Sequence, residues 1–219
     1  KKKTVLPLYT SSTYSFQTAL DVDADGDDDI LLRNNTTGKW LVFMLQAGVV
    51  SGSQPFDLYA SSDFVFAARG DFDGDMDDDI LLRSVTTGKF KKFDVEAGAA
   101  SSSAGLRSLY AAADYQLQVA ADFNADGKDD LLFRNAVTGK YTVFLLNNNI
   151  VNSQGPLNLY SSATYSFASE LDADADTDAD ILLRNDANGT WVLFSMENGL
   201  ISGQNYLGVY SDTNWAVQR

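Results

Sequence analysis

The 219-residue sequence contains no cysteine and no histidine, and each absence excludes a class of chemistry. Without cysteine the chain has no disulfide framework, no thiolate zinc site and no cysteine nucleophile. Without histidine it has no imidazole metal site and no Ser-His-Asp or Cys-His mechanism. These absences remove many catalytic mechanisms, and we expect a protein that is not an enzyme.

Long apolar runs and clusters of basic residues are also missing. The longest uninterrupted apolar run spans residues 40–45, far short of the ~20 residues that cross a bilayer. An apolar segment typical of a secretion signal is absent too, which fits a processed chain or a part of a longer one. The 16 basic residues are scattered among 30 acidic ones, whereas phosphate binding needs a basic stripe. We expect neither membrane insertion nor a nucleic-acid partner.

Glutamate is scarce as well, and the abundant aspartate is concentrated in four short windows. Of the 30 acidic residues 27 are Asp, and 21 of these lie in four nine-residue windows that begin 50, 51 and 50 residues apart. The windows are DVDADGDDD at 21–29, DFDGDMDDD at 71–79, DFNADGKDD at 122–130 and DADADTDAD at 172–180. The surrounding sequence is copied with the same period, so the chain is an internal repeat. We place the repeats at about 10–59, 60–110, 111–160 and 161–210, with a terminal half-repeat at 211–219.

Each repeat is predicted to hold four short strands. An aromatic strand precedes the acidic window, and an apolar run ending in Arg follows it. A Gly turn then leads to a second apolar run, and a Leu-Tyr or Val-Tyr pair closes the repeat. No stretch has the period of a helix, and the run I-L-L-R is apolar on both faces, as in an inner strand. The pattern predicts an all-β fold in a single domain of residues 1–219, a β-propeller of four ~50-residue blades.

Two elements occur a fifth time. The aromatic strand returns at residues 215–217, and the Leu-Tyr pair is present at residues 8–9. These surplus segments could be the ends of a longer propeller or array, covers for exposed edges, or strands that pair with another copy of the chain.

The acidic windows are candidate metal sites. Asp at positions 1, 3, 5 and 9 would bring carboxylates to one point, where each pair repels by about 1 to 4 kcal/mol. A hard cation relieves this repulsion, and a flexible loop with oxygen donors alone favours Ca²⁺, about four ions in all and one per repeat. Position 7 is expected to offer its backbone carbonyl, which explains why Lys is tolerated there. The predicted ligands, with position 7 included, are Asp21, Asp23, Asp25, Asp27 and Asp29; Asp71, Asp73, Asp75, Asp77 and Asp79; Asp122, Asn124, Asp126, Lys128 and Asp130; and Asp172, Asp174, Asp176, Asp178 and Asp180.

Two other interpretations of the windows are weaker. An EF-hand also begins D-x-D-x-D-G, but it needs Glu at position 12. That position holds Leu32, Leu82, Phe133 or Leu183. A merely solvated acidic turn does not explain four copies in the same register.

The pattern D-x-D-x-D-G-x-D-D-I-L-x-R-N-x-T-T-G-x-W resembles the FG-GAP/VCBS-type repeats. These occur in integrin α-chain propellers and in many secreted bacterial and fungal proteins, including some propeller lectins. The resemblance covers nearly the whole chain and implies Ca²⁺ in the loop between the first and second strands of each blade. Met76 and Thr177 depart from the pattern, because they replace the glycine that most easily adopts a positive φ.

Other recurring residues have a functional and a structural interpretation. Aromatic residues after the Gly turn could stack on sugar, although packing between blades is the more ordinary explanation. They are Trp40, Phe90, Tyr141 and Trp191. Arg at the end of the I-L-L-R run is expected to pair with a loop carboxylate rather than to bind anions. Glu96 and Glu197 lie in turns of different repeats and do not form a plausible glycosidase pair.

Together these features predict a calcium-binding, non-catalytic propeller, secreted or at the cell surface, for adhesion or recognition of a glycan or protein ligand. An alternative is a structural subunit of an extracellular fibre or assembly, in which terminal strands join copies of the chain. A further alternative is an accessory module of a secreted hydrolase. The extracellular location follows from the calcium sites, because the low free calcium of the cytosol would leave them empty.

Overall fold

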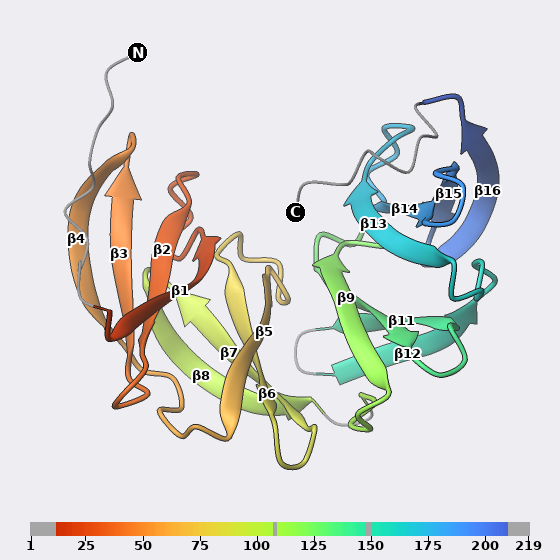
Figure 1. Cartoon of the computed structure of the whole chain (residues 1–219). Helices are drawn as coiled ribbons and strands as arrows, with labels where there is room; N and C mark the ends of the chain where they lie inside the picture. The colour runs from red at the N-terminus through yellow and green to blue at the C-terminus, as the bar shows by residue number, and fades with distance from the viewer. Residues whose placement is uncertain (1–11, 107–108, 148–149, 210–219) are drawn as a thin grey trace. The chain divides into compact units, whose positions relative to one another are not determined.

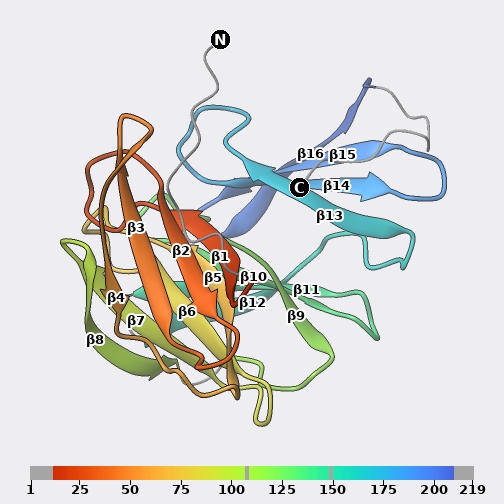
Figure 2. The same ribbon diagram turned by 60° about the vertical axis from the view of Figure 1, so that its left-hand side comes forward.

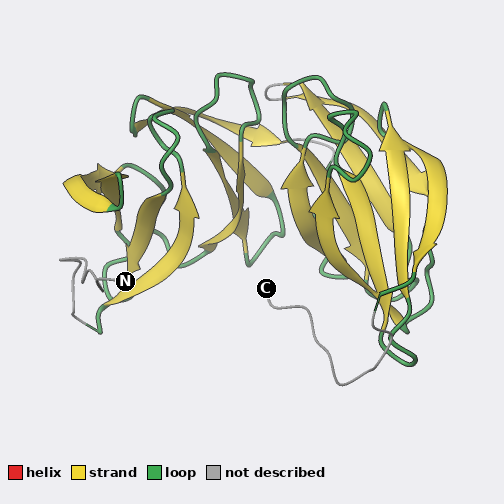
Figure 3. Ribbon diagram, turned by 90° about the horizontal axis from the view of Figure 1, so that it is seen from above, coloured by secondary structure: helices red, strands yellow, loops and turns green. Residues whose placement is uncertain are grey.

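The computed structural model describes residues 12–106, 109–147 and 150–209, and these ranges hold sixteen β-strands and no helix (Figure 1). The strands form four antiparallel sheets, each made of four strands that follow one another along the chain. Figure 3 shows strands and loops alone in the described residues. The all-β prediction is therefore confirmed.

Each sheet corresponds to one repeat. The first two sheets contain β1 (Tyr14–Leu20), β2 (Asp29–Asn34), β3 (Trp40–Gln46) and β4 (Val49–Phe56), then β5 (Phe64–Gly70), β6 (Asp79–Ser84), β7 (Phe90–Glu96) and β8 (Ala99–Leu106). The last two contain β9 (Tyr115–Ala121), β10 (Asp130–Asn135), β11 (Tyr141–Asn147) and β12 (Ile150–Leu157), then β13 (Tyr165–Leu171), β14 (Asp180–Asn185), β15 (Trp191–Glu197) and β16 (Leu200–Leu207).

The second strand of each sheet lies inside the sheet, as its two apolar faces predict. Leu31 in β2 pairs with Thr18 in β1 and with Val42 in β3. Figure 2 shows β2 between these two strands. Leu31 and Val42 have no exposed surface, so the inner strand is buried by its neighbours and by the core.

The chain falls into two compact units, Lys1–Arg107 and Ser108–Arg219, with two sheets in each. In the first unit, Leu31 and Trp40 of one sheet share a core with Ile80 and Phe93 of the next. The second unit has the equivalent core, built around Leu132, Tyr141, Ile181 and Phe194. Each sheet therefore buries apolar side chains together with the other sheet of its own unit.

The tyrosine of the Leu-Tyr pair packs on the sheet that follows it. The Tyr59 ring centroid lies 4.9 Å from that of Phe64 and 5.0 Å from that of Phe93, both in edge contacts. The Leu-Tyr pair that closes one repeat in the sequence thus packs its tyrosine ring against the sheet of the next repeat. The fifth Leu-Tyr pair at residues 8–9 and the fifth aromatic strand at residues 215–217 lie outside the described residues.

The Gly turn needs glycine for two reasons. Gly38 has a φ of 71°, and a Cβ built on it would lie 1.8 Å from the carbonyl oxygen of Ala60. Gly139 has the same close approach, 1.8 Å from the carbonyl oxygen of Ser161. A larger residue would therefore displace the segment that leads into the next repeat.

Candidate metal centres in the acidic loops

The four acidic windows lie between the first and second strands of their sheets, where the resemblance to calcium-binding repeats implies a metal loop. The first window leaves β1 at Leu20 and enters β2 at Asp29. Its last aspartate is thus the first residue of the inner strand. The same placement recurs at Asp79, Asp130 and Asp180.

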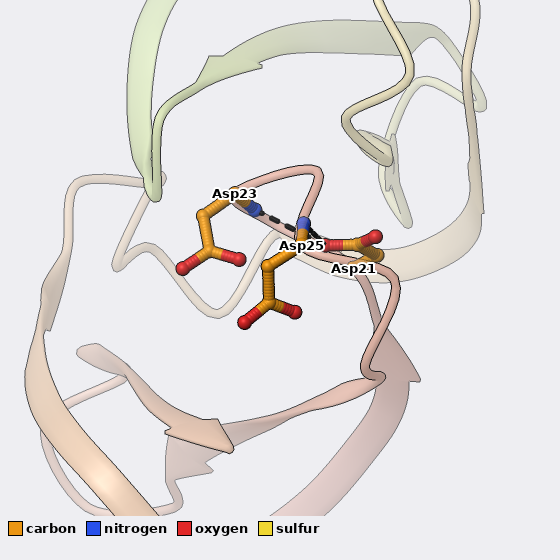
Figure 4. Close-up of side chains that lie close together, drawn as sticks. All are labelled: Asp21, Asp23 and Asp25. Atoms are coloured by element: carbon orange, nitrogen blue, oxygen red, sulfur yellow. Dashed lines mark hydrogen bonds between the residues drawn. The ribbon is translucent and has the colours of Figure 1, made fainter. Parts of the chain in front are cut away.

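The carboxylates at positions 1, 3 and 5 converge in three of the four loops. In each of these loops one carboxylate oxygen from each residue lies within 4.8 Å of the others. The three groups are Asp21, Asp23 and Asp25; Asp71, Asp73 and Asp75; and Asp172, Asp174 and Asp176. Figure 4 shows the first group arranged around one turn of the loop. In the remaining loop Asn124 takes position 3, so two carboxylates and an amide are present.

The aspartate at position 1 organises the loop. Asp21 Oδ1 accepts hydrogen bonds from the backbone amides of Asp23 and Asp25, both at 3.3 Å, and Oδ2 accepts one from Gly26 at 2.9 Å. The first two bonds are drawn in Figure 4. These contacts fold the chain back on itself, so the later carboxylates are held beside the first.

The residues that replace glycine at position 6 adopt the glycine conformation. Met76 and Thr177 have a φ of 78°, equal to that of Gly127. Their backbone amides also donate to the position 1 carboxylate, at 2.9 Å and 3.3 Å. The departure from the sequence pattern leaves the position 6 conformation unchanged, at the cost of a non-glycine residue with a positive φ at this position in two loops.

Several carboxylate oxygens in the loops have no protein partner. Among the described residues, no hydrogen-bond donor reaches the buried Oδ1 atoms of Asp23, Asp73, Asp77 and Asp178. Burial raises the pKa of each of these four carboxyls, and neighbouring carboxylates raise it further. Buried, unpaired oxygens on crowded carboxylates fit a hard cation such as Ca²⁺, which takes six to eight oxygen ligands.

The position 7 side chain caps a neighbouring turn. The Oδ2 atoms of Asp27, Asp77 and Asp178 accept hydrogen bonds from the backbone amides of residues 47, 97 and 198, at 2.6–2.8 Å. These amides belong to the turns between the third and fourth strands. Lys128 takes this position in the third repeat and cannot accept such a bond.

The position 9 aspartate is wholly buried, and in the second loop one of its oxygens lies within 4.8 Å of oxygens of Asp73 and Asp94. Asp130 Oδ1 accepts from the Leu146 amide at 2.8 Å, and Oδ2 accepts from the Phe123 amide at 3.2 Å. Asp29, Asp79 and Asp180 make the same pair of contacts in their repeats. Burial is the largest cause that raises the pKa of Asp29 to about 6, of Asp79 to about 7 and of Asp130 to about 8. The sequence predicts this aspartate as a metal ligand, and in the structure its carboxylate accepts backbone amides. Metal binding by this residue stays a prediction.

Adjacent loops within a unit are hydrogen-bonded to each other. The Asp78 amide donates to the Asp21 carbonyl at 2.6 Å, and the Gly98 amide donates to the Val22 carbonyl at 2.6 Å. In the second unit Ala179 donates to Asp122 and Gly199 to Phe123, both at 2.7 Å. A change at one loop therefore acts directly on the next repeat.

Sequence reasoning missed two charged residues of the second repeat. Lys92 and Asp94 lie on β7, and the Lys92 ammonium contacts the Asp79 carboxylate at 2.9 Å. The signal was present in the sequence, because KKFDV is the only post-Gly run with charged residues.

The aromatic residues proposed as sugar platforms are mostly inaccessible. Trp40, Phe90 and Tyr141 are each 4% exposed or less, which supports the packing interpretation of these residues over sugar stacking. Trp191 is partly buried. An arginine guanidinium lies 4.8–5.5 Å from the centre of each of these four rings. These residues therefore form packed cation–π pairs.

The arginines join consecutive repeats more often through carbonyls than through carboxylates. Arg33 Nη2 donates to the Ser61 carbonyl at 2.9 Å, and Arg134 Nη2 donates to the Tyr165 carbonyl at 3.1 Å. Arg184 alone of these three has the expected carboxylate partner, with Nη1 3.5 Å from Asp186 Oδ1. A structural role is supported, although the partner was predicted correctly only once among the three.

Comparisons with known proteins give little further information. No family model matches the chain, and a search of curated proteins found no match. Among solved structures, a chain of the Photorhabdus luminescens Tc holotoxin pore is similar with a TM-score of 0.40 and 12% identity. The match covers 92% of this chain and 12% of that chain, and likeness at this level supports no inference about function. Within the described residues, no helix is long and apolar enough to cross a membrane.

Proposed function

We propose that the chain is a calcium-binding, non-catalytic β-propeller that acts outside the cell in adhesion or recognition of a glycan or protein ligand. One observation carries the proposal. Carboxylates at positions 1, 3 and 5 converge within 4.8 Å in three loops, and Asp23 and Asp73 each have a buried oxygen without a hydrogen-bond partner among the described residues. A bound Ca²⁺ would supply the positive charge that these oxygens lack, and positions 1, 3 and 5 would hold it.

The propeller part of the proposal is supported by the sheets. Each repeat forms one four-stranded antiparallel sheet in sequential order, and the two sheets of each unit share a core. A propeller uses sheets of this kind as blades, and their radial repetition leaves short, protected edges.

The extracellular part of the proposal follows from metal affinity. Extracellular calcium modules bind with dissociation constants of about 0.1–1 mM. At a dissociation constant near 100 µM, about 1 mM calcium would add roughly 1.4 kcal/mol of stability per site. Four such sites would contribute an amount comparable with the ~5–15 kcal/mol stability of a typical domain.

Thermal unfolding tests the calcium proposal directly. We expect the melting temperature of the full chain to be higher in about 2 mM calcium than in excess chelator, with magnesium at the same concentration giving a smaller increase. Isothermal titration calorimetry should then give up to four binding events. Equal melting temperatures in calcium and in chelator would contradict the proposal.

Recognition has a candidate surface in the first unit. A hollow of about 320 Å³ is lined by residues 33–38 around the Gly turn, among them Arg33, Asn35 and Thr36, and by Ala60 and Ser62 of the segment before β5. Its size and polar lining suit a small polar ligand such as a sugar. A glycan array probed with the calcium-loaded chain tests this, and Asn35→Ala is expected to weaken the binding of any glycan that occupies this hollow.

The structural-subunit alternative depends on terminal strands outside the described residues. Light scattering over a range of concentrations would detect polymers of the chain.

A further inference from the structure

A buried ammonium lies beside the second acidic loop. Lys92 has no exposed surface, which is strongly unfavourable for a charged group unless carboxylates pair with it. Its Nζ lies 2.9 Å from Asp79 Oδ2 and 2.5 Å from Asp94 Oδ1. A third carboxylate, Asp73 at position 3 of the loop, lies 3.7 Å away.

The other repeats have aliphatic residues in this place. Lys92 pairs with Leu81 in the sheet register, and the equivalent partners of the inner strand in the other sheets are Val42, Val143 and Leu193. Asp94 likewise replaces Met44, Leu145 and Ser195. A lysine and an aspartate therefore enter the interior together, in one repeat of the four.

Asp73 links the lysine to the proposed calcium site. Its carboxylate belongs to two groups of oxygens that lie within 4.8 Å of one another, one with Asp71 and Asp75 and one with Asp79 and Asp94. Its Oδ2 faces the Lys92 ammonium, and its buried Oδ1 has no hydrogen-bond partner among the described residues. A cation held at positions 1, 3 and 5 would thus share a ligand with the ammonium.

We propose that Lys92 is a built-in counter-ion of the second loop that weakens calcium binding there. This inference rests on the proposed calcium binding by the loops. The ammonium neutralises part of the carboxylate charge and repels a divalent cation bound a few ångströms away. We expect the calcium dissociation constant of this loop to be at least about tenfold higher than that of the same loop with aliphatic residues at 92 and 94.

Calorimetric titration of calcium into the full chain tests the inference. The double variant Lys92→Val with Asp94→Leu rebuilds the aliphatic pair of the third repeat and leaves no buried aspartate at position 94. One site should then bind at least about tenfold more tightly than in the unmodified chain. Adding Asp75→Asn should abolish that gain, which assigns it to the second loop. Lys91→Met removes the same charge from a partly exposed neighbour on β7 and should leave every affinity unchanged.

A second variant protects the test against misfolding. Lys92→Gln keeps a donor toward Asp79 and removes the charge, so it should tighten the same site, with circular dichroism as the check on folding. If the second loop of the Lys92 variants binds calcium no more tightly than that of the unmodified chain while the other loops also bind, the Lys92 inference is overturned and the proposed function stands. If no loop binds calcium in any of the proteins, both are overturned.

Discussion

In the first, second and fourth acidic loops, positions 1, 3 and 5 carry the same side chain as position 9, and the structure places it in different surroundings. Asp21, Asp23 and Asp25 crowd together at the turn, whereas Asp29 is buried and accepts two backbone amides. The first group includes a buried oxygen, Oδ1 of Asp23, that has no hydrogen-bond partner among the described residues, whereas both oxygens of Asp29 accept backbone amides. A run of alternating aspartates thus contains a candidate metal site at positions 1, 3 and 5 and, at position 9, a buried residue that holds the end of the loop through backbone hydrogen bonds.

The largest expected effect is a loss of folding stability when the position 9 aspartate is removed, compared with removal of an aspartate at position 1, 3 or 5. Asp130→Ala leaves the buried amides of Phe123 and Leu146 without acceptors, and we expect it to lower the free energy of unfolding by about 2–4 kcal/mol in calcium-free buffer. Urea unfolding measures this. Asp126→Ala, at exposed position 5 of the same loop, is the matched control and should cost much less. Equal losses of unfolding free energy in the two variants would contradict the distinction between position 9 and position 5.

The pH dependence of the calcium-free chain sharpens the comparison. Burial raises the pKa of Asp29, Asp79 and Asp130 to about 6, 7 and 8. The folded chain therefore binds more protons than the unfolded chain between about pH 4 and pH 8, so its free energy of unfolding falls as pH rises through that range. The lowered pKa of Asp94 acts in the opposite direction, below about pH 4. We expect a higher melting temperature at about pH 5 than at about pH 7.5 in calcium-free buffer, and the reverse order would contradict it.

Removing one carboxylate from the turn should lower the stability of the chain in calcium and leave it unchanged or raise it slightly in chelator. Asp25→Asn keeps the oxygen that accepts the Asp27 amide, so the turn is retained and one ligand charge is lost. We expect about 1.4 kcal/mol less stability in about 1 mM calcium and no loss, or a small gain, in chelator, because repulsion falls. Melting temperatures in the two buffers measure the difference. Asp28→Asn removes an equal charge outside the convergent group and should show no such reversal.

The smallest expected effect on the free energy of unfolding comes from relieving backbone strain at Met76 without any change in charge. Met76 is 76% exposed and has a φ of 78°, so Met76→Gly removes strain without losing a core contact. We expect a gain of about 0.5–1 kcal/mol in the free energy of unfolding, with or without calcium. Met76→Ala keeps the Cβ and should give no gain. A destabilised Met76→Gly chain in urea unfolding would show that the methionine contributes more than its backbone.

The sequence was sufficient to predict the strands and the loop position of the aspartates, because period and alternation are local properties. I-L-L-R predicted an inner strand, and Leu31 and Leu81 are fully buried. The convergence of positions 1, 3 and 5 was predicted from the same alternation, but in the structure it comes from the position 1 carboxylate, which folds the loop back by accepting backbone amides.

The remaining features depend on where the chain turns, which no local pattern encodes. Asp29 continues the alternation of the loop, but the strand begins at that residue and carries its carboxylate into the interior. Trp40 follows a turn and resembled an exposed platform, yet Arg33 and the carbonyl of Tyr59 enclose it. Burial by a neighbouring repeat is a property of the fold, and residue type alone does not reveal it.

The hydrogen bonds between adjacent loops have a consequence for how such a chain can change over time. Asp78 and Ala179 perform the same task with different side chains, because only their amides donate, and Val22 and Phe123 accept only through their carbonyls. Hydrogen bonds between main-chain atoms are retained whenever the gene segment for a repeat is duplicated. In the first unit the side chain of Asp78 also contributes, because its Oδ2 accepts the Asp21 amide at 3.0 Å, whereas Ala179 has no acceptor in its side chain. The attachment between adjacent repeats therefore persists when this side chain differs.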